Sequence, residues 1–264
     1  MPGAEVWPSG ELEPRGFIVA TTWGSPPGAL GTAVQQARAH DLQLRQEGGD
    51  DIVPVEVLFA GDGAGHTSQA LLRPSRPLRP GATYRLTLGP QEFRWRVSPA
   101  VEVPAPTWLG VPQVVGREYM GASCAESRLL LSAPVSGTGP LQVEVQTRRE
   151  SSTEAYRAHV VAPEDGLLDL GRRFRNGSFD FRPGATYELR MWVLDTHGHR
   201  VALPAPVVVR APGPEDPLPA RLRVLLVERG HTDVWAVTWP YGLGLIGLAL
   251  VLGAAIVASR RARP

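Results

Sequence analysis

Two histidines that flank a glycine, His197-Gly198-His199, form the most metal-like pattern in the chain. Histidines at positions i and i+2 of a strand lie on one face, so both rings could reach one metal ion. Apart from Asp195, however, no third ligand is evident nearby, and the glycine is typical of a hairpin tip. We therefore interpret this pattern as a polar turn and predict no metal site.

Other groups of reactive side chains lack the spacing that a functional site requires. The segment Asp62-Gly-Ala-Gly-His66 does not supply the ordered series of oxygen ligands found in a calcium loop. Two pairs of adjacent carboxylates, Asp50-Asp51 and Glu164-Asp165, lie in predicted turns. We interpret them as solvated side chains rather than as a catalytic dyad. These patterns predict no cofactor.

The single cysteine, Cys124, cannot form an intramolecular disulfide and has no histidine close to it in the sequence. We interpret it as a structural residue rather than a nucleophile. The sequence also contains no phosphate-binding loop, CxxC or HExxH motif. We therefore predict no catalytic residues, and we expect that the protein is not an enzyme.

The composition is typical of many short strands joined by turns. The chain has 29 glycines and 26 prolines, which together exceed 20% of its 264 residues, against a usual share of about 12%. These residues are spread along the chain and separate runs rich in Val, Leu, Thr, Tyr and Trp. A hydrophobic content of 43% argues against low-complexity disorder. We predict an all-β fold.

The distribution of charge disfavours nucleic-acid binding. All 27 basic residues are arginines. Residues 1–105 contain nine arginines and eleven acidic residues, and residues 106–210 contain twelve and eleven. Neither half has the basic surplus of a nucleic-acid-binding domain. We predict no nucleic-acid partner.

The hexapeptide Arg-Pro-Gly-Ala-Thr-Tyr occurs twice, at Arg79–Tyr84 and at Arg182–Tyr187. The copies are 103 residues apart, about the length of one small β-sandwich. This spacing predicts two related modules, at residues 4–105 and 106–211. In each copy we expect Pro-Gly to form a turn, and we expect Tyr84 and Tyr187 to pack in the core with the hydroxyl reaching the backbone.

Alternation of apolar and polar residues indicates where several strands lie. In the first module it predicts strands at 41–45, 53–59, 83–88 and 92–97. In the second module it predicts strands at 128–132, 141–147, 155–161, 187–194, 200–203 and 207–210. We also predict a loop at 61–66 and an exposed turn at 171–178. Residues 28–40 are compatible with either a short helix or a loop.

The residues around the hexapeptides resemble a known class of domain. The segment Phe181–His199 is similar to the late strands of fibronectin type III or bacterial Ig-like domains, which carry a Pro-Gly-x-x-Tyr entry to a strand followed by a hairpin. Leu78–Leu88 is similar, and the opening at residues 8–16 resembles bacterial Ig-like domains of surface proteins. The resemblance implies an Ig-like sandwich followed in tandem by a fibronectin type III-like sandwich. It says little about function, because such sandwiches have many roles.

Residues 241–258 contain no charged and no strongly polar side chain, and we predict that they form one transmembrane α-helix. Eighteen helical residues span about 27 Å, close to the thickness of a hydrocarbon core. A buried core helix is the alternative. Aromatic residues precede the run, apolar residues fill it and arginines follow it, so we expect the membrane anchor to comprise Trp239, Tyr241, Leu245, Leu248, Leu252, Ile256, Arg260, Arg261 and Arg263.

The flanking charges indicate how this helix is oriented. The tail at 259–264 carries three arginines, whereas residues 211–240 are nearly neutral, so the positive-inside rule places the C-terminus in the cytoplasm and both modules outside it. Residues 212–240 are a proline-rich linker and juxtamembrane segment, in which 220–227 could form a strand. Residues 1–16 show no export signal. Either a signal lies upstream of this chain, or the protein is tail-anchored with its modules in the cytoplasm.

Two classes of function follow from this organisation. In the first, the protein is a membrane-anchored, non-catalytic cell-envelope protein whose modules act as spacers or bind a protein or cell-surface partner, in addition to membrane lipid. In the second, it is an accessory or receptor subunit of an envelope enzyme or secretion complex. Genes for a protease or a secretion system next to its own would favour the second class.

Overall fold

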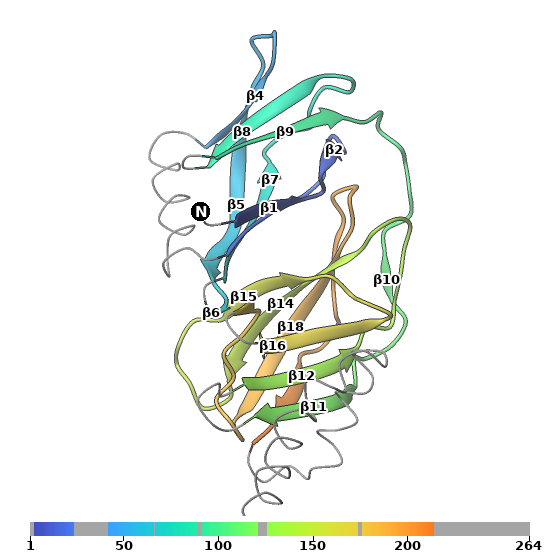
Figure 1. Ribbon diagram of the computed structural model, residues 1–264. Coiled ribbons are helices and arrows are strands. Elements are labelled where there is room, and N and C mark those ends of the chain that lie inside the picture. The colour runs from blue at the N-terminus through green and yellow to red at the C-terminus, as the bar shows by residue number, and fades with distance from the viewer. Residues whose placement is uncertain are drawn as a thin grey trace, which may run out of the picture. The chain divides into compact units, whose positions relative to one another are not determined.

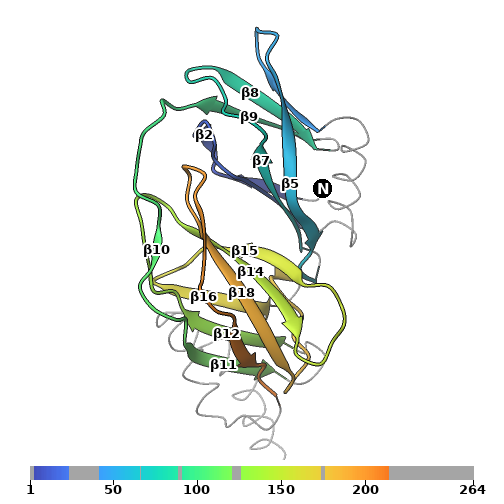
Figure 2. The ribbon, with the colours of Figure 1, turned by 180° about the vertical axis from the view of Figure 1, so that it is seen from behind.

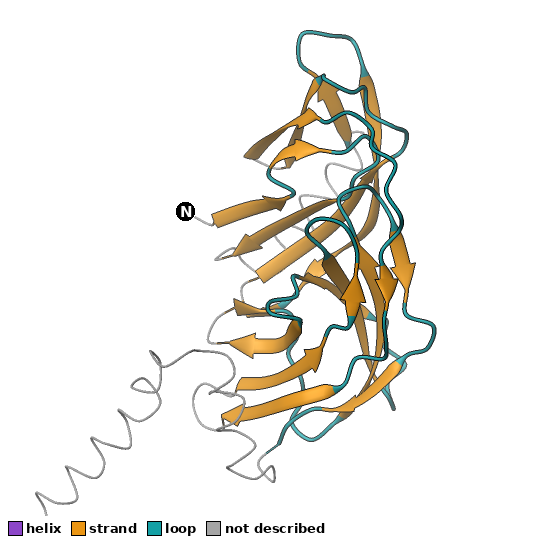
Figure 3. Ribbon diagram, turned by 90° about the vertical axis from the view of Figure 1, so that its right-hand side faces the viewer, coloured by secondary structure: helices purple, strands orange, loops and turns teal. Residues whose placement is uncertain are grey.

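The computed structural model describes residues 3–23, 42–65, 67–88, 91–120, 126–173 and 176–213. Every regular element in these residues is a β-strand, which confirms the all-β class for this part of the chain (Figures 1 and 3). Within the same residues, no helix is long and apolar enough to cross a membrane. The predicted span at 241–258 and its anchor residues lie outside the described residues, as does the segment 28–40.

The first sandwich is built from nine strands, most of which pair in antiparallel fashion. Their bounds are β1 Gly3–Trp7, β2 Gly10–Leu12, β3 Ile18–Trp23, β4 Gln43–Gln46, β5 Ile52–Asp62, β6 Ala64–Gly65, β7 Thr67–Pro74, β8 Thr83–Leu88 and β9 Gln91–Val97. Eight of them follow the order β1-β3-β7-β5-β4-β8-β9-β2. The long strand β5 pairs with both β4 and β7, so it joins the two sheets.

The chain changes sheet between β1 and β2. Strand β1 pairs antiparallel with β3, and only a few residues later β2 pairs parallel with β9 at the other end of the strand order. A first strand divided between the two sheets, together with this strand order, fits the Ig/fibronectin type III-like class of sandwiches.

The core of the first sandwich follows the period of the strands. On β8, Tyr84, Leu86 and Leu88 are buried and alternate with side chains that are more exposed. On β9, Trp95 and Val97 are buried in the same way. The residues of this core come from the stretch of sequence that begins at Leu12 and ends at Val97.

The second sandwich has two main sheets (Figure 2) and one separate pair of short strands, the first and fourth in the following list. Its strands are β10 Thr107–Trp108, β11 Val114–Met120, β12 Glu126–Ser132, β13 Val135–Ser136, β14 Gln142–Arg149, β15 Arg157–Val161, β16 Leu167–Arg173, β17 Asn176–Gly177, β18 Thr186–Leu194, β19 Arg200–Ala202 and β20 Val207–Arg210. One sheet contains β11-β12-β16, and the other contains β15-β14-β18 with β19 and β20 both on β18. This division also fits the Ig/fibronectin type III-like class of sandwiches.

A separate apolar core lies between these two sheets. It draws on Leu129 and Leu131 from β12, Val143 and Val145 from β14, and further residues up to Ala211. Both cores belong to one compact unit, which includes all of the described residues.

Two predicted loops are wrong. The segment 61–66, predicted as a loop, continues β5 to Asp62 and then forms β6. The segment 171–178, predicted as an exposed turn, instead contains the end of β16 and β17, and Gly171 and Ser178 are buried. Strand β5 continues because Gly61 and Asp62 pair with β7. Strands β6 and β17 form because they pair with each other, Gly65 opposite Asn176 and Ala64 opposite Gly177.

Candidate functional site

The repeated hexapeptide forms the same local structure in both sandwiches. The glycine of each Pro-Gly turn has a positive φ, +77° at Gly81 and +71° at Gly184, a conformation in which glycine is not strained. Tyr84 is fully buried and Tyr187 is 9% exposed. The Tyr84 hydroxyl accepts a hydrogen bond from the backbone N–H five residues upstream at 3.3 Å, and the Tyr187 hydroxyl does so at 2.8 Å. Each tyrosine thus forms a tyrosine corner, in which the ring packs in the core of its sandwich and the hydroxyl is hydrogen-bonded to the Pro-Gly turn.

The first of these corners also contains a buried carboxylate. The Tyr84 hydroxyl donates a hydrogen bond to Asp51, and the Arg76 guanidinium lies 2.5 Å from the same carboxylate. Arg79 lies 3.6 Å away. The hydrogen bond from Arg76, followed by that from Tyr84, holds the pKa of Asp51 below its usual value. The adjacent pair Asp50-Asp51 therefore includes one structural carboxylate.

The histidine pair lies at the hairpin turn between β18 and β19, and Asp195 caps this turn. Asp195 Oδ1 accepts hydrogen bonds from the backbone N–H groups of His197 at 3.0 Å and His199 at 2.8 Å. His199 Nδ1 lies 2.7 Å from Asp195 Oδ2. The side chain of Asp195 thus has its partners within the hairpin. Among the described residues, no group of three or more His, Cys, Asp or Glu side chains could hold a metal ion.

The tip of this hairpin packs against the first sandwich. A Cβ atom added to Gly198 would collide with the carbonyl oxygen of Arg15, and one added to Gly16 would lie 2.6 Å from that of Thr196. His197 Nδ1 is 3.8 Å from a carboxylate oxygen of Glu13. The glycine between the histidines therefore permits close approach of two backbones.

A second contact between the sandwiches is made by Gln69 of β7, which is buried. Its Oε1 accepts a hydrogen bond from the N–H of Val160 at 2.6 Å, and its Nε2 donates to the carbonyl oxygen of Val160 at 3.1 Å. Nε2 also lies 3.1 Å from Thr21 Oγ1. Val160 is on β15, an end strand of its sheet. Gln69 thus satisfies backbone groups that an edge strand would otherwise leave unpaired.

An apolar cluster surrounds this hydrogen-bonded pair. The first sandwich contributes Phe17, Val19 and Leu71, and the second contributes Val160 and Leu194, all of them buried. Trp7, Leu58 and Phe59 pack against the cluster. We call the cluster, the Gln69–Val160 pair, the hairpin contact and the β6–β17 pairing the module junction.

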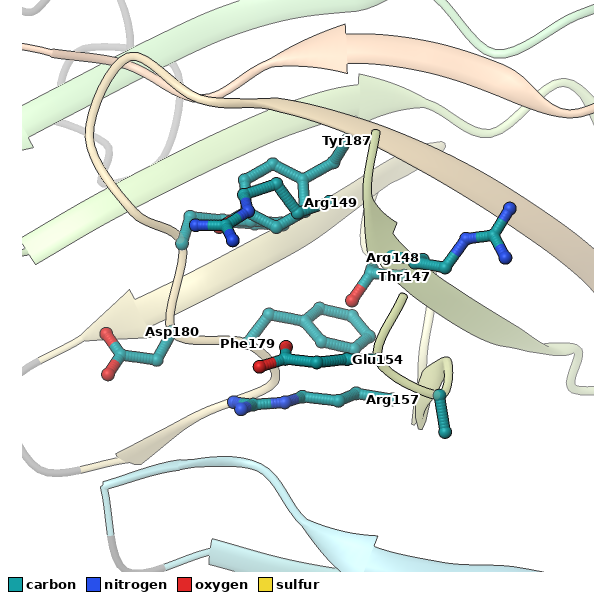
Figure 4. A pocket seen from close by; sticks show the side chains of 10 residues that line it. Thr147, Arg148, Arg149, Glu154, Arg157, Phe179, Asp180 and Tyr187 are labelled. Atoms are coloured by element: carbon teal, nitrogen blue, oxygen red, sulfur yellow. The ribbon is translucent and has the colours of Figure 1, made fainter. Parts of the chain in front are cut away.

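A pocket of about 170 Å³ lies in the second sandwich, where three strands begin or end. Arg149 is the last residue of β14, Arg157 is the first of β15, and Tyr187 is near the start of β18. Because Thr147 pairs with Arg157 and Arg149 pairs with Tyr187, the three strands present these side chains beside one another. Figure 4 shows the pocket, whose lining also includes Glu154, Phe179, Asp180 and Phe181.

The sequence analysis assigned no function to Asp62, Glu164 or Cys124. In the structure, the side chain of Asp62 has a hydrogen-bond partner. Asp62 accepts a hydrogen bond from the hydroxyl of Ser68 at 2.6 Å. Glu164 lies in the turn before β16, where its backbone pairs with that of Leu167. Cys124 lies outside the described residues.

The sequence analysis missed Gln69 and the pocket. The signal for Gln69 was the run Thr67-Ser68-Gln69, a polar segment that leads directly into apolar Ala70-Leu71-Leu72. No local signal marked the pocket, because its residues come from three separate stretches of the chain.

No family model and no curated protein matches the chain. Among solved structures, it is similar to pullulanase type I from Bacillus subtilis, with 12% identity, 76% of this chain covered and a TM-score of 0.23. The chain spans 24% of the length of that protein. The chicken CNTN1 FN1–FN3 domains have 13% identity and a TM-score of 0.28, with 80% of this chain and 65% of theirs covered.

The tandem Ig repeats of Dlar are similar at 13% identity and a TM-score of 0.25, with 77% of this chain and 97% of theirs covered. At such TM-scores, the assignment of an Ig/fibronectin type III-like fold rests on the strand order described above.

Proposed function

We propose that the protein is a membrane-anchored, non-catalytic cell-envelope protein that displays its two sandwiches as one rigid interaction or spacer unit. The module junction carries this proposal. A flexible tether would need neither the buried Gln69–Val160 pair nor strand pairing between the sandwiches. A junction with an apolar centre and satisfied polar groups favours a fixed geometry over independent motion.

The partners of the candidate side chains support a non-catalytic role. Asp195 is hydrogen-bonded within its own hairpin, and Asp51 is occupied by Tyr84 and Arg76. Catalytic acids and bases need to reach a substrate, whereas these carboxylates are buried in structural hydrogen bonds.

The anchor in this proposal is the uncharged run at 241–258, followed by Arg260, Arg261 and Arg263. The arginines favour a cytoplasmic C-terminus, which puts the two sandwiches on the other side of the membrane. Membrane lipid is then one partner, and a protein or cell-surface ligand is the other.

Topology mapping tests the anchor. Reporters that are active only in the cytoplasm or only outside it would be fused to each terminus, and the full chain would be fractionated. We expect the protein in the membrane fraction with a cytoplasmic C-terminus and an external N-terminus. A fully soluble chain would rule out the anchor, and an external C-terminus would reverse the orientation.

Distance measurements test the rigid unit. Spin labels at the exposed positions Thr87 and Val208, introduced as cysteines in a Cys124→Ser background, would report the separation of the two sandwiches. We expect one narrow distance distribution. A broad distribution in the otherwise unchanged protein would contradict the rigid-unit proposal.

A further inference from the structure

The first tyrosine corner shows how this local structure holds a carboxylate. The Tyr84 hydroxyl accepts from the backbone of Arg79 and donates to Asp51. Arg76 completes the set at 2.5 Å from the same carboxylate. One hydroxyl and one guanidinium thus converge on a single buried acid, which is a charge-assisted arrangement and stronger than one between neutral groups.

The second corner has the same hydroxyl, but no residue in the described part of the chain supplies such an acid. Tyr187 accepts from the backbone of Arg182 at 2.8 Å, and among the described residues its own proton has no acceptor. The residue paired with the tyrosine across the strands is Gln46 in the first sandwich and Arg149 in the second. A cation therefore stands beside Tyr187, at a corner where the first sandwich holds Asp51.

Two arginines of the pocket have no ion-pair partner among the described residues. Within the described part of the chain, neither Arg149 nor Arg157 has a carboxylate oxygen within 4.0 Å, and Arg149 Nε is buried without a hydrogen-bond acceptor. An unsatisfied buried guanidinium N–H is costly, and an acceptor supplied from outside would remove that cost.

Arg148, the residue before Arg149, provides the contrast. Its Nε is likewise buried without an acceptor, but its guanidinium lies 3.1 Å from Glu188 and stacks on the ring of Tyr156 at 4.5 Å. Figure 4 shows its side chain pointing away from those of Arg149 and Arg157. The alternation of β14 thus directs the guanidinium of Arg148 to the outer face of the sheet and that of Arg149 to the pocket, although Arg148 also belongs to the pocket lining.

We propose that the pocket binds a single carboxylate group, from an acidic side chain or the chain terminus of a protein partner, through Arg149, Arg157 and the hydroxyl of Tyr187. The rings of Phe179 and Phe181 would pack against the apolar part of the ligand. This binding site goes beyond the proposed role as a rigid interaction or spacer unit, because that role does not require the pocket to bind a ligand.

The acidic residues of the pocket limit the charge of the ligand. Glu154 and Asp180 line it together with Arg148, Arg149 and Arg157. Arg148 is neutralised by Glu188, so the other four side chains sum to no net charge. A group with one negative charge fits such a pocket, whereas a phosphate with nearly two would meet repulsion from both acids. We therefore assign the pocket to carboxylates rather than phosphates.

The test follows the side-chain Nε–Hε signals of arginine by NMR in the full-length protein, with Arg149 assigned from the Arg149→Met variant. Two probes carry one carboxylate each: acetyl-Gly-Glu-Gly-amide presents a side chain, and acetyl-Gly-Gly-Gly presents a chain terminus. We expect at least one of them to shift the Arg149 signal saturably. Its uncharged counterpart, with Gln or a terminal amide, should bind at least about tenfold more weakly.

Variants separate a site from a general charge effect. Arg149→Met should abolish binding and Arg148→Met should leave it within about twofold, because Arg148, although it also lines the pocket, is already paired with Glu188. Tyr187→Phe should weaken binding severalfold, and Glu154→Gln should strengthen it by removing a competing carboxylate.

Three results would overturn the proposal. The first is no saturable shift with either probe at tens of millimolar. The second is equal binding of the carboxylate and amide probes, or equal loss in Arg148→Met and Arg149→Met. The third is tighter binding of acetyl-Gly-phosphoserine-Gly-amide than of either carboxylate probe. None of these outcomes depends on the topology experiment, so the membrane anchor and the carboxylate-binding pocket are tested independently.

Discussion

The side-chain amide of Gln69 forms hydrogen bonds with both backbone groups of Val160, at 2.6 and 3.1 Å, and so acts as a one-residue strand between the two sandwiches. Both residues are buried, and an apolar cluster packs around them. Buried backbone groups that lose their partners destabilise a protein strongly, so the geometry of the junction depends on one amide.

Replacing Gln69 by alanine should therefore weaken the junction. The change leaves the N–H and C=O of Val160 without partners, and we expect it to lower the free energy of unfolding by about 2–4 kcal/mol. Chemical denaturation measures this loss. The spin-label distance distribution between positions 87 and 208 should broaden in the same variant.

The matched control for this change is Gln91→Ala, because Gln91 is a half-buried strand residue whose side chain forms no hydrogen bond within the described part of the chain. It should change stability by less than about 0.5 kcal/mol. An equal loss of stability in Gln69→Ala and Gln91→Ala would contradict the role assigned to Gln69 at the junction.

Gly198→Ala tests the hairpin contact. Both Gly198, at φ +92°, and Gly139, at φ +77°, have backbone conformations that strain an alanine by about 1–2 kcal/mol. Only at Gly198 would the new Cβ meet the carbonyl oxygen of Arg15, since a Cβ at Gly139 meets no atom within 4 Å.

We therefore expect Gly198→Ala to cost at least about 1 kcal/mol more than Gly139→Ala in chemical denaturation. Equal costs would mean that the hairpin tip is not held against the first sandwich in solution.

The strands that the sequence predicted best are those with one covered face. Residues 83–88 alternate because Tyr84, Leu86 and Leu88 point into the core while Arg85 and Thr87 are exposed. Such alternation is a local property, and it survives without knowledge of the fold.

Strand β7 was missed because both of its faces are covered. Thr67, Ser68 and Gln69 are buried although they are polar, since they lie where the strand meets the second sandwich. Simple alternation within the predicted strand 53–59 would put Val55, Val57 and Phe59 on one face, but the register of β5 shifts between Val57 and Phe59. Bulges and junctions depend on distant partners, which periodicity does not report.

The two tyrosine corners should differ in strength. Tyr84→Phe removes a donor from the buried carboxylate of Asp51, which should cost about 2–3 kcal/mol. Tyr187→Phe removes only an acceptor for a backbone N–H, which should cost about 1 kcal/mol. Chemical denaturation of both variants under one set of conditions measures the difference. A larger loss in Tyr187→Phe would contradict the role assigned to Asp51.

The last prediction concerns acid and His159, which is 6% exposed and packs edge-on against Phe179 at 6.0 Å. Burial lowers the pKa of His159 from 6.5 to about 4, because a charged imidazole loses its hydration there. In the unfolded chain, His159 therefore becomes protonated as the pH falls below 6.5, whereas in the folded chain it stays neutral until about pH 4.

Stability should be independent of this group above pH 6.5 and should fall as the pH is lowered from 6.5 to about 4, by on the order of 3 kcal/mol in total. His159→Leu should flatten this part of the stability curve, whatever it does to stability at pH 7.5. Denaturation series between pH 7.5 and 4.5 measure both slopes. Because Asp51 loses its contribution only as the pH falls through its lowered pKa, it does not act in this window. An unchanged slope in His159→Leu would show that His159 is protonated in the folded protein or exposed to solvent.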